Sequence, residues 1–283
     1  MHNPLPENLD KRTVDDFGRE WARFDQSGTS PDEMHAMFDG YFAVFPWGEL
    51  PAGAVGFDAG CGTGRWAAMV APRVGHLHCV DAAQEALGVA RWRLASAPNV
   101  TLHHASIDAM PFADGSMDFG YSLGVLHHMP DTAGGLAACV AKLKPGAPFL
   151  VYLYYAFDNR PAWFRLLWRA SDSVRRVLAP LPFGIKSRIT DLLALTVYWP
   201  LARLAGVLEA LGLGVDAFPL SAYRRRSFYS MRTDALDRFG TRLEQRFTRT
   251  QIAAMMAAAG LVDIRFSDRV PYWCAVGRRA VGR

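Results

Sequence analysis

The spacing of apolar residues changes near residues 50, 155 and 245 of the chain. Before residue 50, apolar positions recur every three or four residues, which is the spacing of one helix face. Ser30, Pro31 and Glu33 then have the order of an N-cap, a first helical residue and a capping-box acid. We therefore expect residues 1–50 to be helical and to act as a lid. The apolar face of the first predicted helix consists of Val14, Phe17, Trp21 and Phe24.

Residues 51–155 alternate short apolar runs with longer helical stretches. This alternation predicts parallel strands that are covered by helices on both faces. Two further runs near the C-terminus follow each other too closely for a crossover helix, so they must be antiparallel. We predict an α/β fold, Rossmann-like and doubly wound, with a mostly parallel seven-stranded sheet and an antiparallel last strand. The predicted strands are residues 54–57, 76–81, 100–106, 117–125, 148–155, 261–267 and 271–279.

Residues 156–245 are predicted to be a mainly helical insertion that forms an acceptor-binding cap on a core of residues 51–155 and 246–283. The whole chain carries a net charge of +4, but this segment has 14 Lys and Arg against 8 Asp and Glu. That balance favours an anionic substrate or partner, or a membrane surface, although solvated arginines on ordinary helix faces have the same composition. The most apolar run, residues 192–202, is about half the length of a bilayer span, and Pro200 and Arg203 are expected to interrupt it. We expect no transmembrane segment.

A glycine-rich turn follows the first predicted strand, in the stretch "VGFDAGCGTG" at residues 55–64. Gly60 and Gly62 would let the backbone approach a ligand closely, and the following helix would offer unpaired amides. A dinucleotide fingerprint needs Gly or Ala at the sixth position from Gly60, but Arg65 stands there. Asp58, ahead of the glycines, would repel a pyrophosphate and stabilise an ammonium group. S-adenosylmethionine carries such a group on its methionine end.

A second acid, Asp81, ends the next predicted strand, 17 residues after Gly64. A carboxylate there can accept hydrogen bonds from both hydroxyls of a ribose. It could instead serve as the N-cap of the helix that follows. With the glycine turn upstream, we favour ribose binding.

The motifs "FDAGCGTG", "VDAAQEAL", "MPFADGSMDFGYSLGVLHHMPD", "LKPGAPFLV" and "FTRTQIAAMMAAAGLVDIRF" occur in this order. In these motifs the chain resembles the class I S-adenosylmethionine-dependent methyltransferases of the small-molecule type, over residues 53–155 and 246–278. The resemblance implies that Asp81 and the following Ala82 hold the ribose of S-adenosylmethionine. It also implies that the methionine end is held by Asp58, Gly60, Cys61, Gly62 and Gly64.

The resemblance also implies an adenine site after the third strand, where the family's common pattern has an Asp five residues before a Pro-Phe pair. Ser106 occupies that position here, and Asp108 is out of register. We expect Ser106 and the backbone of Ile107 at the adenine edge, with a weaker acceptor than usual. Ser122 and Leu123, at the end of the fourth strand, are expected beside the sulfonium.

Candidate catalytic residues follow the fourth and fifth strands. His127 and His128 could move a proton near neutral pH, but a double His recurs in family members with different substrates, so one of the two is expected to be structural. Tyr154 could line the acceptor pocket or be a core aromatic. In the insertion, Tyr223, the arginines at 224–226 and Tyr229 are candidate acceptor contacts.

These features predict a methyltransferase that moves a methyl group from S-adenosyl-L-methionine to an O, N or C atom of a small molecule, which can be large, hydrophobic or anionic. A cofactor-binding pseudoenzyme and a nicotinamide-dependent oxidoreductase are the alternatives. Nucleic acid is not favoured as a substrate, and peripheral membrane contact and the oligomeric state stay open. We expect no metal, because the cysteines lack a C-x-x-C pair, and a cytoplasmic location. The four cysteines are Cys61, Cys79, Cys139 and Cys274.

Overall fold

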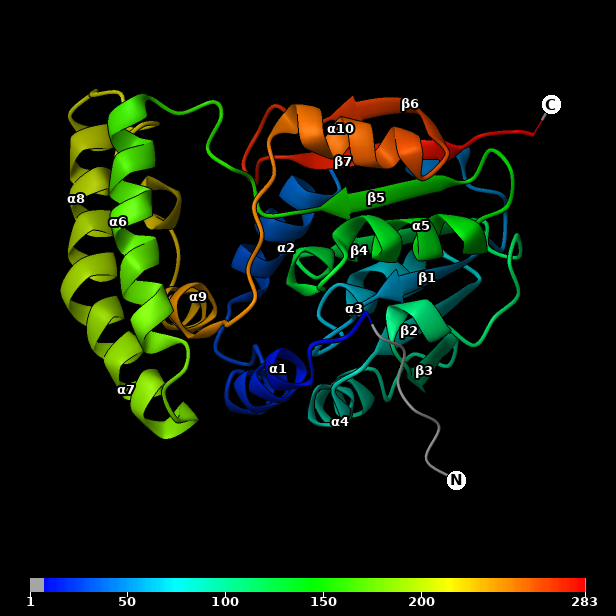
Figure 1. The fold of residues 1–283 in the computed structure, drawn as a ribbon, viewed down its shortest axis with the longest axis horizontal. Coiled ribbons are helices and arrows are strands. Elements are labelled where there is room, and N and C mark those ends of the chain that lie inside the picture. The colour runs from blue at the N-terminus through cyan, green and yellow to red at the C-terminus, as the bar shows by residue number, and fades with distance from the viewer. Residues whose placement is uncertain (1–7, 283) are drawn as a thin grey trace. The chain divides into compact units, whose positions relative to one another are not determined.

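The computed structural model describes residues 8–282, which divide into two compact units (Figure 1). Unit 1 contains the described parts of residues 1–22, 36–156 and 243–283, and unit 2 contains residues 23–35 and 157–242. The chain therefore passes from one unit to the other four times. The sequence suggested a different division, in which residues 1–50 form one segment.

Unit 1 is built around one seven-stranded sheet with the order β3-β2-β1-β4-β5-β7-β6 (Figure 1). Strands β1 to β5 pair in parallel, whereas β7 is antiparallel to both β5 and β6. This confirms the predicted Rossmann-like α/β sheet with its antiparallel last strand. The strands are β1 (Val55–Ala59), β2 (His76–Asp81), β3 (Val100–His104), β4 (Phe119–Leu123), β5 (Pro148–Tyr152), β6 (Leu261–Phe266) and β7 (Cys274–Arg279).

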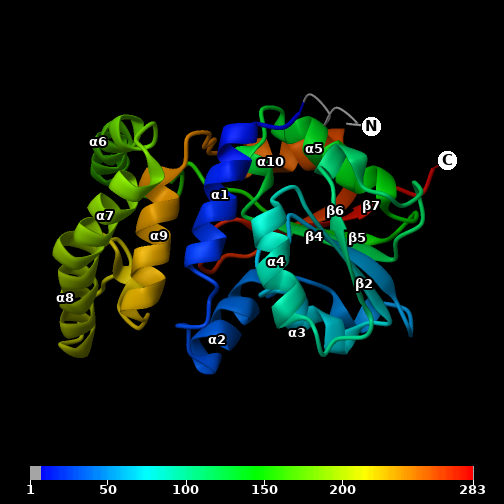
Figure 2. The ribbon, with the colours of Figure 1, turned by 90° about the horizontal axis from the view of Figure 1, so that it is seen from below.

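Helices connect these strands and cover the sheet (Figure 2). Thr248 and Gln251 form the capping box that starts the last helix of unit 1. The helix that the sequence predicted after the glycine turn is short, because regular α-helix is limited to Ala67–Val70. The helices of unit 1, one of which starts in unit 2, are α1 (Lys11–Arg23), α2 (Pro31–Tyr41), α3 (Ala67–Val70), α4 (Gln84–Arg93), α5 (Thr132–Lys142) and α10 (Arg249–Ala258).

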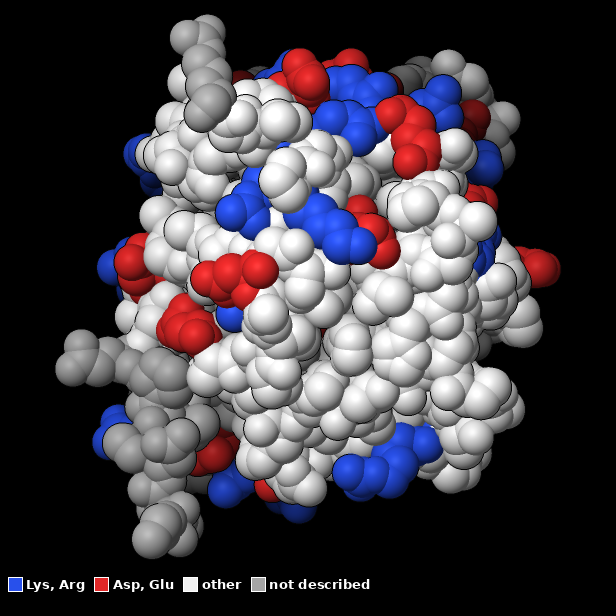
Figure 3. Space-filling view, turned by 90° about the vertical axis from the view of Figure 1, so that its right-hand side faces the viewer, with Lys and Arg blue, Asp and Glu red and all other residues white. Residues whose placement is uncertain are grey.

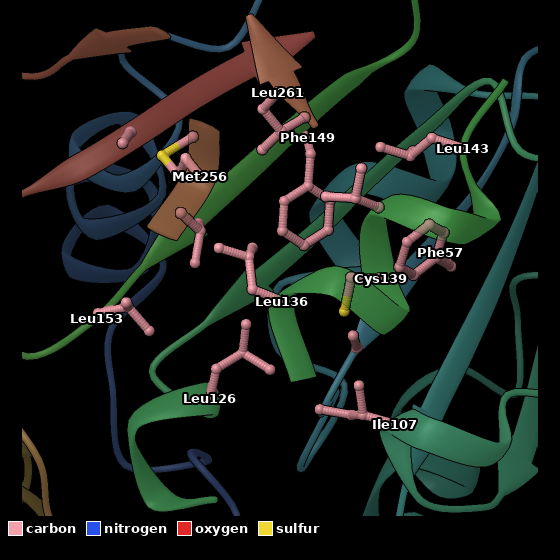
Figure 4. Packing of buried hydrophobic residues seen from close by; sticks show 14 of the residues in the cluster. Phe57, Ile107, Leu126, Leu136, Cys139, Leu143, Phe149, Leu153, Met256 and Leu261 are labelled. Carbon is pink, nitrogen blue, oxygen red and sulfur yellow. The ribbon is translucent and has the colours of Figure 1, made fainter. Parts of the chain in front are cut away.

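A continuous apolar core lies between the sheet and the helices α5 and α10 (Figure 4). Phe57 and Phe149 extend from β1 and β5 toward Leu136 on α5 and Met256 on α10, and all four are fully buried. Packing of this kind fixes the strand ends, and the strand ends carry the candidate site residues. The ring of Tyr121, on strand β4, packs against the ring of Phe42 with the two centroids 5.3 Å apart.

Unit 2 consists of helices packed around α9 (Phe228–Gly240), which contacts α6, α7 and η5. Its small core joins Leu178, Tyr198, Met231 and Phe239. Residues 23–35 belong to this unit because the Ser230 hydroxyl donates to Glu33 at 2.6 Å. The other elements of the unit are α6 (Ala162–Leu178), α7 (Phe183–Leu193), the π-helical turn η5 (Ala194–Tyr198), α8 (Trp199–Ala210) and the short turn η6 (Ser221–Tyr223).

Elements α7, η5 and α8 form one continuous helix, Phe183–Ala210, which is long and apolar enough to cross a membrane by length and composition. The sequence analysis expected Pro200 to interrupt it, and that expectation was wrong. Pro200 lies at the start of α8, directly after the π-helical turn. The wider turn accommodates the ring and the missing amide hydrogen, so the helix continues.

Candidate active site

The glycine turn after β1 has the backbone geometry that the sequence predicted for it. Gly60, Gly62 and Gly64 all have positive φ, at 83°, 53° and 71°. A Cβ on Gly60 would lie 2.5 Å from Val125, so the residue must be glycine. A Cβ on Gly62 would make ordinary van der Waals contact with the Trp21 ring, whose Nε1 would be the nearest atom at 3.5 Å. An alanine at Gly62 would therefore clash with none of these side chains, although its positive φ would be strained.

Asp58 is the last-but-one residue of β1 and is almost completely buried, with 1% exposure. Its Oδ2 atom has no hydrogen-bond partner among the described residues. Burial raises the pKa of Asp58 to about 8, against the lowering effects of the Tyr121 hydroxyl and the more distant Arg65 guanidinium. A buried carboxyl with an unused oxygen is suited to an added cation, which would favour its charged form.

Asp81, at the end of β2, accepts a hydrogen bond from the glycine turn. One carboxylate oxygen accepts from the Gly62 amide at 2.8 Å, and the other accepts from the Ala83 amide at 2.8 Å. Its pKa is raised by burial, and these backbone bonds counteract part of the effect. The N-cap of α4 is Ala83, so Asp81 does not take the capping role that was the alternative to ribose binding. Each carboxylate oxygen retains a lone pair for a further donor.

Ser106 and Ile107 follow β3, at the position expected for the adenine edge. Ser106 is 1% exposed, and its hydroxyl has no hydrogen-bond partner within residues 8–282. Ile107 is buried and starts a short 3-10 turn. A buried hydroxyl without a partner is costly unless a ligand or a water supplies one. Asp108 lies beside Asn8, and its pKa is raised by burial.

Four other residues that were predicted for the cofactor site are buried or make contacts near the strand ends. The Ser122 hydroxyl donates to the carbonyl of Ala59 at 2.8 Å and so ties β4 to β1. Leu123 is buried at the end of β4. The Cys61 thiol is buried against Cys79, and its pKa is raised well above the usual range, so it is not a nucleophile. Ala82 offers a carbonyl that His104 contacts at 3.0 Å.

Helix α1 contributes two aromatic side chains that the sequence analysis did not assign to the cofactor site. Trp21 lies over Gly62, and Arg65 lies over the Trp21 ring at 5.5 Å from its centroid. Phe17 stacks with Trp21 and contacts the ring of His128 at 4.8 Å. The helix period had placed Phe17 and Trp21 on one face, but it could not show which strand ends that face would cover.

The residues of unit 1 fit the group that the turn predicts. The unpartnered Asp58 oxygen matches an ammonium group, Asp81 has lone pairs for two hydroxyls, and the unpartnered Ser106 hydroxyl matches the adenine edge.

Comparison with known proteins agrees with this geometry. Residues 57–146 match a family model described as a methyltransferase domain. Over 190 residues the chain is 32% identical to the ubiquinone biosynthesis O-methyltransferase of Xanthomonas axonopodis pv. citri, a match that covers 65% of this chain and 74% of that protein. The chain belongs to the class I S-adenosylmethionine-dependent methyltransferases. Its cofactor is S-adenosylmethionine, and the nicotinamide and pseudoenzyme alternatives are set aside.

Other methyltransferases give shorter or more distant matches. The ubiquinone biosynthesis O-methyltransferase of Aromatoleum aromaticum is 35% identical over 143 residues, which are 49% of this chain and 58% of that protein. The match therefore spans less than two thirds of that relative's length. A putative methyltransferase from Bacillus halodurans has the same fold, with a TM-score of 0.53, 13% identity, and coverage of 87% of this chain and 100% of that one.

Beyond the cofactor residues, this methyltransferase has a cluster of rings after β4 and β5. His127 is fully buried, its ring lies 3.8 Å from that of Tyr154, and both of its nitrogens are without a hydrogen-bond partner among the described residues. Burial lowers the pKa of His127 well below its usual value, so the ring is neutral. His128 contacts the carbonyl of Leu243 through Nδ1 at 2.7 Å. Since a carbonyl only accepts, Nδ1 carries the proton and Nε2 is the acceptor nitrogen.

The segment that precedes α10 completes this cluster, and sequence analysis did not identify it. The Gln245 amide donates to the carbonyl of His127 at 3.0 Å. Arg246 lies over the Tyr154 ring at 4.9 Å from its centroid and forms an ion pair with Glu244 at 2.8 Å. The signal available in the sequence was a charged run, "RLEQR", at the return from the insertion to the core.

The insertion residues suggested as acceptor contacts have partners inside unit 2. Tyr223 packs on Tyr198 with centroids 5.5 Å apart, and Arg226 lies over the Tyr223 ring. Arg224 and Arg225 both pair with Glu209. The Gln26 amide donates to the Tyr229 hydroxyl at 2.9 Å. Each of these side chains thus has a structural contact within the unit.

Proposed function

We propose that this methyltransferase transfers its methyl group to an O, N or C atom of a small-molecule acceptor that binds beside His127, His128 and Tyr154. The observation that supports this is the buried His127 ring, whose two nitrogens lack partners among the described residues. Such a ring is costly to bury unless an incoming polar group completes its hydrogen bonding. A hydroxyl or amine at the acceptor's reacting atom would do so.

The two histidines take different roles in this proposal. His128 is held by the Leu243 carbonyl in one tautomer, which directs the lone pair of Nε2 away from that carbonyl. A base that is oriented by a third group is the usual arrangement for taking a proton from a nucleophile. His127 stays neutral and provides a hydrogen bond to the acceptor. Bound S-adenosylmethionine supplies an electrophilic methyl group on its sulfonium, so positioning carries a large share of the rate.

The surroundings of the histidines favour an aromatic or anionic acceptor. The Tyr154 ring stacks on His127, and the Arg246 guanidinium lies over the same tyrosine ring. The pKa of Arg246 is raised, chiefly by Glu244 against the effect of its own burial, so the guanidinium stays charged. A flat, electron-rich ring or a carboxylate would find complementary groups here.

A small molecule is favoured over nucleic acid by the surface charge. On the face of unit 1 in Figure 3, basic and acidic side chains of the described residues are interspersed around a wide uncharged area. A phosphate backbone would favour a continuous basic track instead. We also propose a cytoplasmic location, which fits cysteines that are all free and buried.

The experiment is transfer of a labelled methyl group from S-adenosylmethionine to a panel of phenols, amines and aromatic carboxylates. With the best acceptor, His128→Ala is expected to lower kcat by about 10²-fold to 10⁴-fold, the usual contribution of a general base. Binding of S-adenosylhomocysteine should be nearly unchanged. His35→Ala is the control, because that exposed ring bonds only its own helix, at the Pro31 carbonyl.

Two results would contradict the proposal. If the protein transferred the methyl group to RNA or DNA but to no small molecule, a small-molecule acceptor would be excluded. An unchanged kcat in both His127→Ala and His128→Ala would exclude the roles given to the histidines.

A further inference from the structure

We propose that unit 2 binds the surface of a lipid bilayer that contains anionic lipids, through the outward faces of α6 and of the continuous helix α7–η5–α8. The proposal concerns unit 2 alone and does not depend on the acceptor assigned above. It rests on the distribution of apolar and basic side chains over these helices.

Helix α6 has its polar residues on the inside and its apolar residues on the outside. Asp172 and Arg175 are buried, and they bond each other at 2.7 Å. At about 100° per residue, the exposed apolar positions fall within an arc of roughly 100° on the other side. Leu166 and Val177 in this arc are each 68% exposed. The large apolar side chains of the arc are Trp163, Leu166, Leu167, Val174 and Val177.

The helix α7–η5–α8 repeats the pattern. Its inward face joins the core of unit 2 through Ala194, Tyr198 and Ala202. Its outward face carries large apolar side chains, and one more follows directly after the helix. Since a soluble unit normally keeps such side chains apart or covered, an exposed series on two helices marks an interaction surface. The series is Ile185, Leu192, Leu195, Val197, Trp199, Leu204, Val207 and Leu211, and the last of these is 71% exposed.

The outward faces of α6, α7 and α8 carry exposed arginines, and this positive charge favours an anionic partner. Each of the three acidic residues on α6, α7 and α8 is paired inside unit 2: Asp172 with Arg175, Asp191 with Arg23, and Glu209 with Arg224. Arg165, Arg169 and Arg176 on α6 are exposed, although Arg176 also pairs with Asp172. By the helix geometry they form a stripe between the buried face and the apolar arc, about 60–100° from the edge of the arc. Arg188 on α7 and Arg203 on α8 are exposed as well, and Arg203 donates to the carbonyls of Arg224 and Arg226.

An apolar arc with arginines on one flank and tryptophan among its exposed residues is the pattern of a helix that lies in the membrane interface. The apolar side chains enter the acyl boundary while the long arginine side chains reach the headgroups. Trp163 and Trp199, both about half exposed, have the side chain that is enriched at this depth.

The same structure argues against a transmembrane helix and for a helix lying flat. Lys186, on the long helix, is buried and donates to the Gly240 carbonyl of α9 at 2.8 Å. Asp191 accepts from Arg232 of α9 at 2.9 Å. A helix bound along one side by charged contacts to α9 cannot be surrounded by lipid, but its other side can rest on a bilayer.

The test is sedimentation of the full-length protein with vesicles of phosphatidylcholine alone or of phosphatidylcholine with phosphatidylglycerol. We expect binding to the mixed vesicles that weakens as salt increases. The double variant Leu166→Gln/Val177→Gln should bind roughly tenfold more weakly or worse. Arg165→Gln/Arg169→Gln should lose a similar factor on mixed vesicles only. Trp92→Gln, which removes an apolar side chain that is 73% exposed on α4 of unit 1, is the matched control and should bind like wild type.

Folding of each variant is checked by its affinity for S-adenosylhomocysteine, which should stay at the wild-type value. Three outcomes would overturn the proposal. The wild-type protein could bind neither kind of vesicle. The Leu166/Val177 variant could bind as tightly as wild type. Finally, the wild-type protein could be a dimer in solution that this variant converts to monomers, which would make a second copy the occupant of the surface.

Discussion

The backbone amide of Gly62 donates a hydrogen bond to the carboxylate of Asp81 at 2.8 Å. Through this bond, the acid at the end of β2 fixes the glycine turn that follows β1. The same carboxylate is the candidate ribose acceptor, so one side chain both shapes the turn and offers lone pairs to the ligand. The candidate cofactor site is therefore built before the cofactor arrives.

Gly62→Ala is expected to fold and to lose cofactor affinity. Its φ of 53° would strain an alanine by about 1–2 kcal/mol, while no protein atom would lie closer than 3.5 Å to the new Cβ. The methyl group would project beside the Trp21 ring, on the part of the turn where we expect the ligand to bind. Gly53→Ala is the matched control, because Gly53 also has a positive φ, of 70°, and open space around it. Both variants should lose similar thermal stability, and calorimetry with S-adenosylhomocysteine should show weaker binding for Gly62→Ala alone. Equal affinities would contradict the placement of the ligand at Gly62.

Binding of S-adenosylhomocysteine is expected to release a proton near neutral pH. The free protein holds Asp58 protonated at pH 7, because burial raises its pKa to about 8. The ammonium group of the ligand favours the charged carboxylate and keeps its own proton below about pH 7.7. Affinity should therefore rise between pH 6 and 7.5, by at most about tenfold per pH unit. Calorimetry in two buffers with different ionisation enthalpies measures the released proton, and Asp58→Asn should abolish it.

Asp58→Asn should also stabilise the free protein at pH 8 while it weakens ligand binding. The folded-state pKa of Asp58, about 8, lies above its ordinary value of 3.8, so the folded free protein retains the proton that the unfolded chain loses. This group therefore reduces stability progressively as pH rises from about 4 to 8. The increase in Tm should be larger at pH 8 than at pH 5, at about 2–4 °C for each kcal/mol. A Tm that falls equally at both values would show that Asp58 is needed for the fold itself.

Ser106→Ala and Ser122→Ala are expected to have opposite effects. The Ser106 hydroxyl has no partner among the described residues, so its loss should leave Tm nearly unchanged and weaken S-adenosylhomocysteine binding by about one hydrogen bond, roughly fivefold. The Ser122 hydroxyl bonds Ala59, so its loss should lower Tm and leave affinity nearly unchanged. The effect at Ser106 should disappear with an analogue that lacks the exocyclic amine of adenine. A persistent effect would place Ser106 elsewhere than at the adenine edge.

The sheet and the cofactor side of the site were predictable because they depend on local patterns. The periods of apolar residues indicated the alternation of strands and helices. The glycines between Asp58 and Gly64 indicated a tight turn, because glycine readily adopts the positive φ that such a turn needs. The acceptor side was not predictable to the same degree. Phe17 and Trp21 reach the site from α1, and Arg246 reaches it from the far end of the insertion. Their placement depends on tertiary packing between segments that are far apart in the chain, and no spacing rule predicts it.

The error at Pro200 has a related cause. A proline normally ends a helix, and the sequence offered no sign that a π-helical turn would precede it. As a result, the continuous helix Phe183–Ala210 was expected to be interrupted near Pro200. The exposed apolar residues of α7, η5 and α8 form one outward face only because these three elements are a single continuous helix.

The four chain crossings between the units mean that the helical unit is not a detachable module. Residues 23–35 belong to it, and Glu33 is bonded to Ser230, which is nearly two hundred positions later in the chain. Removing the first 35 residues would take a piece out of both units, and excising residues 157–242 would leave residues 23–35 without the helices they bond. For protein engineering, the helical unit of a relative could not be transferred by exchanging one continuous stretch. Two separate segments would have to be replaced together.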